Sequence, residues 1–169
     1  MKKFLLITLS MMLISAFFAG SASPAAAKEP KILEFDTMVG TTAGLTGAQS
    51  QVPLRGINGG GLPWMLTSAH GELTTSGKLE IEVQGLVLAA GTNTGSNPSA
   101  VFRGLVSCLR SDGSVQNILT DPFPATTGPA SSGGGNAKIE AMVALPQPCI
   151  APIVFVTNAG GSWFAVTGN

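Results

Sequence analysis

Ser68, His70 and Glu72 are the residues whose types and spacing could support a reaction. Serine, histidine and a carboxylate are the groups of nucleophilic hydrolysis, in which the imidazole takes the serine proton and the acid orients the imidazole. The three residues alternate along the chain, so they share one face if the segment is a β-strand. Neighbours on one strand face lie about 7 Å apart, beyond hydrogen-bond reach unless the backbone bends. A secreted hydrolase using Ser68 and His70 is therefore an alternative hypothesis.

Metal and phosphate chemistry have less support in the sequence. His70 is the only histidine and there are two cysteines, so the three or four clustered ligands of a zinc site cannot be assembled. The acidic residues show no D-x-D-x-D spacing for calcium. The glycine run at 56–61 precedes no helix, although its backbone amides could form an anion nest. The sequence predicts no metal and no cofactor.

Ligand binding without catalysis is the third possibility. Arg55, Asn58 and Trp64 lie in or beside the glycine run and are the candidate ligand-binding residues. An exposed indole at Trp64 could serve a carbohydrate-binding module as its aromatic platform, whereas core packing is the better assignment for Trp163. The carbohydrate hypothesis therefore predicts that Trp64 is exposed to solvent.

The segments that position these residues alternate between apolar and polar side chains, and none downstream of the first 27 residues has helical spacing. In 78–84 the odd positions are apolar and the even positions are polar. A glycosidase-type carboxylate pair could be drawn from Glu80 and Glu82, but a solvated strand face is the simpler interpretation. Alternation at 137–145 likewise predicts that the odd positions are buried.

Further strands are predicted at 64–73, 101–110, 150–156 and 163–166. The segment 150–156 is apolar on both faces, as in a central strand. About eight strands bounded by turns favour an all-β fold, either an antiparallel β-sandwich or a partly closed barrel.

Irregular segments separate the predicted strands. A change of phase after Gly85 predicts a β-bulge that continues the strand. Loops at 40–50, 91–99 and 126–136 are rich in glycine and small polar residues, and we expect them to be flexible. None is long enough to divide the chain, so 28–169 is predicted to be one domain.

The first 27 residues have the composition of a secretory signal peptide. Lys2 and Lys3 precede an apolar run at 4–18, and Ala25-Ala26-Ala27 forms a small-residue cleavage site. The apolar run is shorter than the roughly 20 residues that span a bilayer, so cleavage rather than anchoring is predicted. The mature protein would begin at Lys28 and be secreted or held at the cell envelope, without a membrane segment.

The cysteine content predicts a disulfide, and the charge balance limits the kinds of partner. An even number of cysteines without CxxC spacing, in a chain bound for an oxidising compartment, predicts a structural disulfide between Cys108 and Cys149. The whole chain has no formal net charge, and losing Lys2 and Lys3 with the signal leaves the rest with an acidic excess. That balance argues against nucleic acid as a partner.

Three strings are distinctive: Pro53-Leu54-Arg55-Gly56-Ile57-Asn58-Gly59-Gly60-Gly61-Leu62-Pro63-Trp64, Cys149-Ile150-Ala151-Pro152-Ile153-Val154-Phe155-Val156 and Trp163-Phe164-Ala165. Together they resemble an uncharacterised family of small secreted bacterial all-β proteins. The resemblance implies export, one disulfide and a β fold, and no activity. A looser likeness to chordin-type (CHRD) repeats rests on Gly71-Glu72-Leu73, Gly77-Lys78-Leu79 and Gly85-Leu86, without the histidine pair of those repeats.

The favoured function is a non-catalytic binding or structural domain outside the cell. Only 11% of the residues are charged, which leaves few groups for catalysis. The partner would be an extracellular protein or a glycan, reached through loops or an exposed strand edge. The edge strands of an open sandwich can also pair with a second copy, so a monomer or a weak homodimer is expected.

Overall fold

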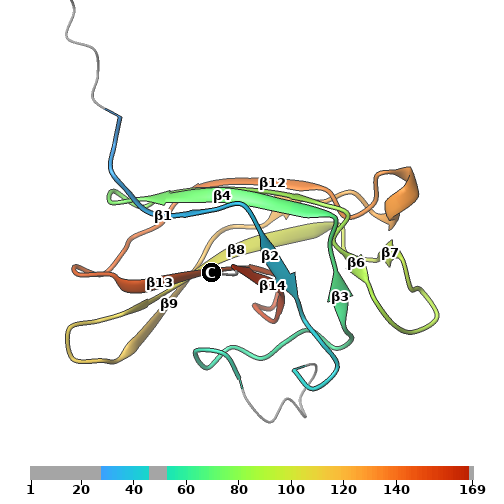
Figure 1. Ribbon diagram of the computed structural model, residues 1–169, viewed down its shortest axis with the longest axis horizontal. Helices are drawn as coiled ribbons and strands as arrows, with labels where there is room; N and C mark the ends of the chain where they lie inside the picture. Colours follow the sequence, from blue (N-terminus) through green and yellow to red (C-terminus); the bar gives the residue numbers. More distant parts are fainter. Residues whose placement is uncertain (1–27, 46–52, 168–169) are drawn as a thin grey trace, which may run out of the picture.

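The computed structural model describes residues 28–45 and 53–167 and shows two antiparallel sheets packed face to face (Figure 1). Sheet A contains, in spatial order, β1 (Lys31–Phe35), β4 (Ser68–Thr74), β5 (Lys78–Gln84) and β12 (Ala137–Met142). Sheet B contains β10 (Phe123–Pro124), β8 (Val101–Leu109), β13 (Ile150–Thr157), β14 (Trp163–Thr167) and β2 (Met38–Gly40). The strand β9 (Val115–Leu119) also pairs with β8, on the edge that β10 shares.

Two short ribbons and one turn of helix complete the described fold. The ribbons pair β3 (Trp64–Met65) with β6 (Val87–Leu88) and β7 (Ser96–Asn97) with β11 (Gly128–Pro129). The 3-10 helix η1 (Ala130–Ser132) follows β11. No helix among the described residues is long and apolar enough to cross a membrane. The predicted all-β fold is confirmed, in the form of a sandwich. The predicted signal peptide, residues 1–27, lies outside the described residues.

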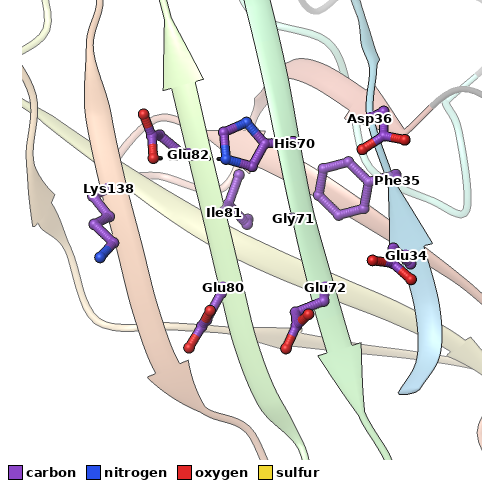
Figure 2. Close-up of a pocket in the computed structure, with 10 residues that line it drawn as sticks. All are labelled: Glu34, Phe35, Asp36, His70, Gly71, Glu72, Glu80, Ile81, Glu82 and Lys138. Atoms are coloured by element: carbon purple, nitrogen blue, oxygen red, sulfur yellow. Dashed lines mark ion pairs between the residues drawn. The ribbon is translucent and has the colours of Figure 1, made fainter.

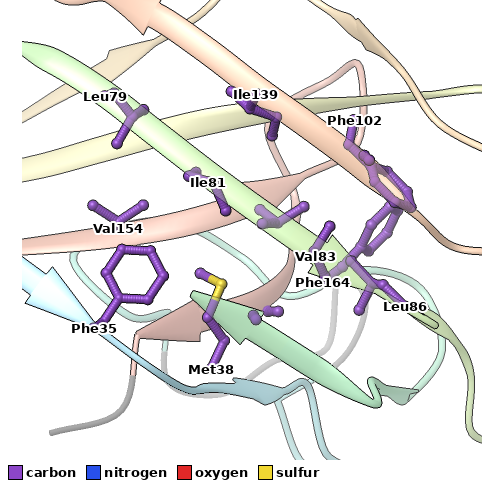
Figure 3. Packing of buried hydrophobic residues seen from close by; sticks show 14 of the residues in the cluster. Phe35, Met38, Leu79, Ile81, Val83, Leu86, Phe102, Ile139, Val154 and Phe164 are labelled. Carbon is purple, nitrogen blue, oxygen red and sulfur yellow. The ribbon is translucent and has the colours of Figure 1, made fainter. Parts of the chain in front are cut away.

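The core lies between the two sheets, as the alternating sequence pattern predicts. In β5 the residues Leu79, Ile81 and Val83 are buried while their polar neighbours face outward. Figure 3 shows these side chains meeting Val154 of β13 in one interior. Phe102 fills one end of that interior and lies edge-on to Phe164, with ring centroids 5.8 Å apart.

The predicted disulfide joins Cys108 to Cys149, and the described residues include no free cysteine. Cys108 is fully buried in β8, and Cys149 immediately precedes β13. These strands are neighbours, with Leu109 opposite Ile150. The disulfide therefore fastens the two central strands of sheet B at one end.

A second apolar layer covers the outer face of sheet B. Residues 53–61, here called the strap, cross the outer face between β2 and β3. Ile57 of the strap packs with Leu105, Phe155 and Trp163. The strap is held by main-chain hydrogen bonds from Gly60 N to Trp163 O (2.7 Å) and from Trp163 N to Asn58 O (3.0 Å). β13 is apolar on both faces because one faces the core and the other faces the strap.

Two local predictions are wrong. The chain does not continue as a bulged strand after Gly85: β5 ends at Gln84, and Gly85, at φ +62°, donates its N–H to Asn136 Oδ1 (2.9 Å) while the chain turns toward β3. The loop at 126–136, expected to be flexible, is closed by hydrogen bonds from Thr126 N to Asn136 O and from Gly135 N to Thr126 O. Local composition did not reveal these hydrogen-bond partners.

Candidate functional site

The outer face of sheet A gathers half of the charged side chains of the described chain. This charged face consists of Lys31, Glu34, Glu72, Lys78, Glu80, Glu82, Lys138 and Glu140, together with His70. The strand register places Glu34 opposite Glu72, Glu72 opposite Glu80, and Glu80 opposite Glu140. Four carboxylates thus form a row across the sheet. Like charges at opposed positions repel, so the row needs cations.

Three lysines provide these cations. Lys31 Nζ lies 2.6 Å from Glu34 Oε1 and 2.5 Å from Glu72 Oε2. Lys78 pairs with Glu80, and Lys138 Nζ lies 2.6 Å from Glu140 Oε1. The hydrogen bond from Lys31 lowers the pKa of Glu72, and that from Lys138 lowers the pKa of Glu140. These interactions favour the ionised forms of Glu72 and Glu140.

The Glu72 ion pair makes a testable contribution to acid stability. Because the folded pKa lies below the ordinary 4.5, the contribution is complete above that value and is lost as the pH falls through the folded pKa. Between about pH 5 and about pH 3, the melting temperature of the wild type should therefore fall more steeply than that of Glu72→Gln. Thermal melts across this range check the prediction. Parallel curves for the two proteins would contradict it.

The candidate residues Ser68, His70 and Glu72 lie on the outward side of β4. The partner of the histidine is on the next strand: His70 Nε2 lies 3.6 Å from Glu82 Oε2. Glu72 is engaged by Lys31, and Ser68 lies opposite Gln84. The His70 side chain is 58% exposed. The arrangement provides a solvated imidazole beside a carboxylate, and the alternation along β4 separates that imidazole from the serine.

A shallow hollow lies in the charged face (Figure 2). His70 and Glu82 stand at one end and Glu72 and Glu80 at the other. Gly71 forms part of the floor. No larger residue fits at this position, because a Cβ would lie 2.6 Å from Cζ of Phe35 and clash with the Glu80 carbonyl. The hollow suits weak contact with a cationic group. Within residues 28–45 and 53–167, no group of three or more side chains is placed to hold a metal ion.

The ligand-binding candidates do not converge on one site. Trp64 is only 5% exposed and stacks on Phe164, with ring centroids 3.8 Å apart. Its pairing in β3 turns the indole into the core, so the exposure that a carbohydrate-binding module requires is not found. Arg55 is half-buried in the strap, where its Nη2 donates to Ala151 O (3.0 Å). Asn58 is exposed, and its carbonyl binds the strap to Trp163.

A feature that the sequence analysis missed is a groove where the two sheets diverge, here called the open side. Sheet B contributes Ile118, Leu119, Thr120, Asp121 and Phe123, and sheet A contributes Glu140, Ala141, Met142, Val143 and Ala144. Both sides present edge strands: among the described strands β9 pairs only with β8, and β12 pairs with β5 and, at Ala137, forms an isolated bridge to Ala125. Met142 is 68% exposed, the largest fraction among the exposed large hydrophobic residues of the described chain.

Hydrogen bonds at the ends of these strands show which main-chain groups face the groove. Thr126 N donates to Asn136 O, away from β5, and Val143 N donates to Gly77 O, on the β5 side. Alternation therefore turns the main-chain groups of Lys138, Glu140 and Met142 outward.

The same alternation applies to β9. Arg110 N donates to Ser114 O and Thr120 N donates to Gly104 O. The main-chain N–H and C=O groups at the even positions of β9 therefore point toward β8. The outward set is therefore Val115, Asn117 and Leu119. Residues 115–119 do not alternate in polarity, and no sequence pattern shows which strands lie at an edge.

Comparisons of the chain with protein-family models, curated proteins and solved structures found no match. The resemblance to small secreted bacterial proteins therefore stays a prediction.

Proposed function

We propose that the protein is an exported, non-catalytic binding domain that holds an extended segment of a partner protein at the open side. Export is supported by the composition of residues 1–27 and by the Cys108–Cys149 disulfide, which is typical of oxidising compartments. In the described part of the chain His70 pairs with Glu82 rather than with a serine, which favours binding over hydrolysis. The observation that carries the proposal is the groove between the edges of β9 and β12.

An extended segment is the occupant that matches the groove. Edge strands offer main-chain donors and acceptors, and an added strand satisfies them while pockets select its alternate side chains. Phe123, Val143 and Met142 supply apolar surface for those side chains. Asp121 and Glu140 line the groove, and among residues 28–45 and 53–167 no lysine or arginine does. The partner segment should therefore alternate apolar with basic residues.

The variant Glu140→Pro tests the proposal. Proline removes the N–H of residue 140, which faces the groove, while the hydrogen bonds of β12 to β5 use the odd positions. We expect the affinity for a labelled nine-residue peptide of alternating valine and lysine to fall at least about tenfold, measured by fluorescence anisotropy.

Glu140→Thr is the matched control, because it removes the same charge and keeps the N–H group. It should retain most of the affinity that Glu140→Pro loses. Equal affinity of Glu140→Pro and Glu140→Thr, or equal binding of a scrambled peptide, would overturn the strand-addition proposal. A circular dichroism spectrum of each variant shows whether the sheet has been kept.

A further inference from the structure

Two buried polar atoms lie beneath the strap without a hydrogen-bond partner in the described part of the chain: Arg55 Nη1 and Ser107 Oγ. Ser107 is fully buried in β8. A buried donor that has lost its water and gained no partner is costly, so native proteins rarely leave one unpaired. Two such atoms in one region indicate that something else satisfies them.

The register of sheet B shows that the two atoms belong to one region. Ser107 lies between Asn117 of β9 and Ile153 of β13. Its side chain has the same orientation as that of Leu105, two residues earlier, which packs against the strap. The Ser107 hydroxyl therefore points toward the strap and away from the core.

Arg55 reaches both β9 and β13 on the outer face of sheet B. Its carbonyl accepts from Asn117 Nδ2 (3.0 Å), and its Nη2 donates to Ala151 O (3.0 Å), just before Ile153. The Arg55 side chain consequently runs from β9 to β13 across β8 at the level of Ser107. Both Arg55 and Ala151 have positive φ angles, +53° and +44°, so this contact is made despite backbone strain.

The charge of Arg55 determines what kind of ligand fits. None of the ion pairs of the described residues includes Arg55, and half of the described charged residues lie on sheet A, across the core. A guanidinium N–H and a serine O–H are both donors, and a partly buried cation without a counter-ion favours a negative ligand. A neutral water would satisfy the donors but leave the charge uncompensated.

We infer that Arg55 and Ser107 form a binding site for a small monovalent anion, of which chloride and bromide are the simplest members. The anion accepts from Arg55 Nη1 and Ser107 Oγ and fastens the strap to sheet B. The inference does not rest on the proposed partner segment, because neither Arg55 nor Ser107 lines the groove of the open side.

Thermal melts of the exported protein in increasing sodium bromide, at ionic strength held constant with sodium sulfate, test the inference. The wild type should show a saturable rise in melting temperature. Ser107→Ala should weaken the apparent bromide affinity at least about tenfold. Ser131→Ala, which removes a hydroxyl from η1, should behave as the wild type.

Bromide also scatters anomalously, so a crystal grown in sodium bromide locates it independently. An anomalous peak within hydrogen-bond distance of both Arg55 Nη1 and Ser107 Oγ, together with the loss of affinity in Ser107→Ala, supports the site. A peak without that loss means an adventitious ion only. That result overturns the inference. A Ser107→Ala protein that is more stable than the wild type at every salt concentration would also overturn it, because the buried hydroxyl would then have no partner at all.

Discussion

Replacing Phe102 with alanine should lower the free energy of unfolding by about 3–5 kcal/mol. Phe102 has no exposed surface and lies between the sheets, with its ring centroid 5.8 Å from that of Phe164 and 6.4 Å from that of Trp64. Truncation removes the buried ring and leaves a cavity that the two rigid aromatic neighbours cannot easily fill. Urea unfolding at equilibrium measures the loss, which should appear as a lower midpoint with an unchanged slope.

Val115→Ala provides the comparison, because Val115 is 42% exposed at the edge of sheet B. Its effect should stay below about 1 kcal/mol. If Phe102→Ala and Val115→Ala cost the same, Phe102 is not a central residue of the core and the packing described between the sheets is contradicted.

The double substitution Cys108→Ala with Cys149→Ala should lower the free energy of unfolding by about 2–5 kcal/mol. The two cysteines are separated by 41 positions, so the disulfide restricts a long loop of the unfolded chain. Cys108 is also fully buried, which adds lost packing in β8.

Reductant separates the covalent contribution from the packing contribution. Added dithiothreitol should lower the stability of the wild type toward that of the double variant and leave the double variant unchanged. A wild type that is insensitive to reductant after full unfolding and refolding in it would show that the disulfide contributes little.

Much of the fold follows from the sequence because burial has a simple period in strands. The alternation at 78–84 predicted which side of β5 faces the core, and the two-sided apolar segment at 150–156 predicted a central strand. These strand features depend on each residue's own polarity, which the sequence shows directly. The cysteine pairing followed from the even number of cysteines and the predicted export.

Other features depend on contacts between distant segments, which polarity does not encode. The chain turns after Gly85 because Asn136, far along the sequence, accepts its N–H. The strap covers sheet B through main-chain bonds at Asn58 and Trp163. Trp64 was assigned to a possible binding edge because a glycine run precedes it, but its pairing with Leu88 turns the ring inward.

The candidate catalytic residues likewise combine one feature set by local polarity with others set by contacts between strands. Alternation correctly placed Ser68, His70 and Glu72 on one face of a strand. The cross-strand register, which the sequence does not contain, then set Glu82 beside His70 and Lys31 beside Glu72. The open side was missed because the identity of the edge strands is decided by sheet order.

The most direct test of the binding proposal is an amide chemical-shift map of the purified protein, recorded by two-dimensional NMR during titration with the alternating valine-lysine peptide. Strand addition predicts that the largest changes occur at the outward amides of the two edge strands, namely Val115, Asn117, Leu119, Glu140 and Met142. Changes confined to the charged face around His70 and Glu82, or no changes at all, would contradict it.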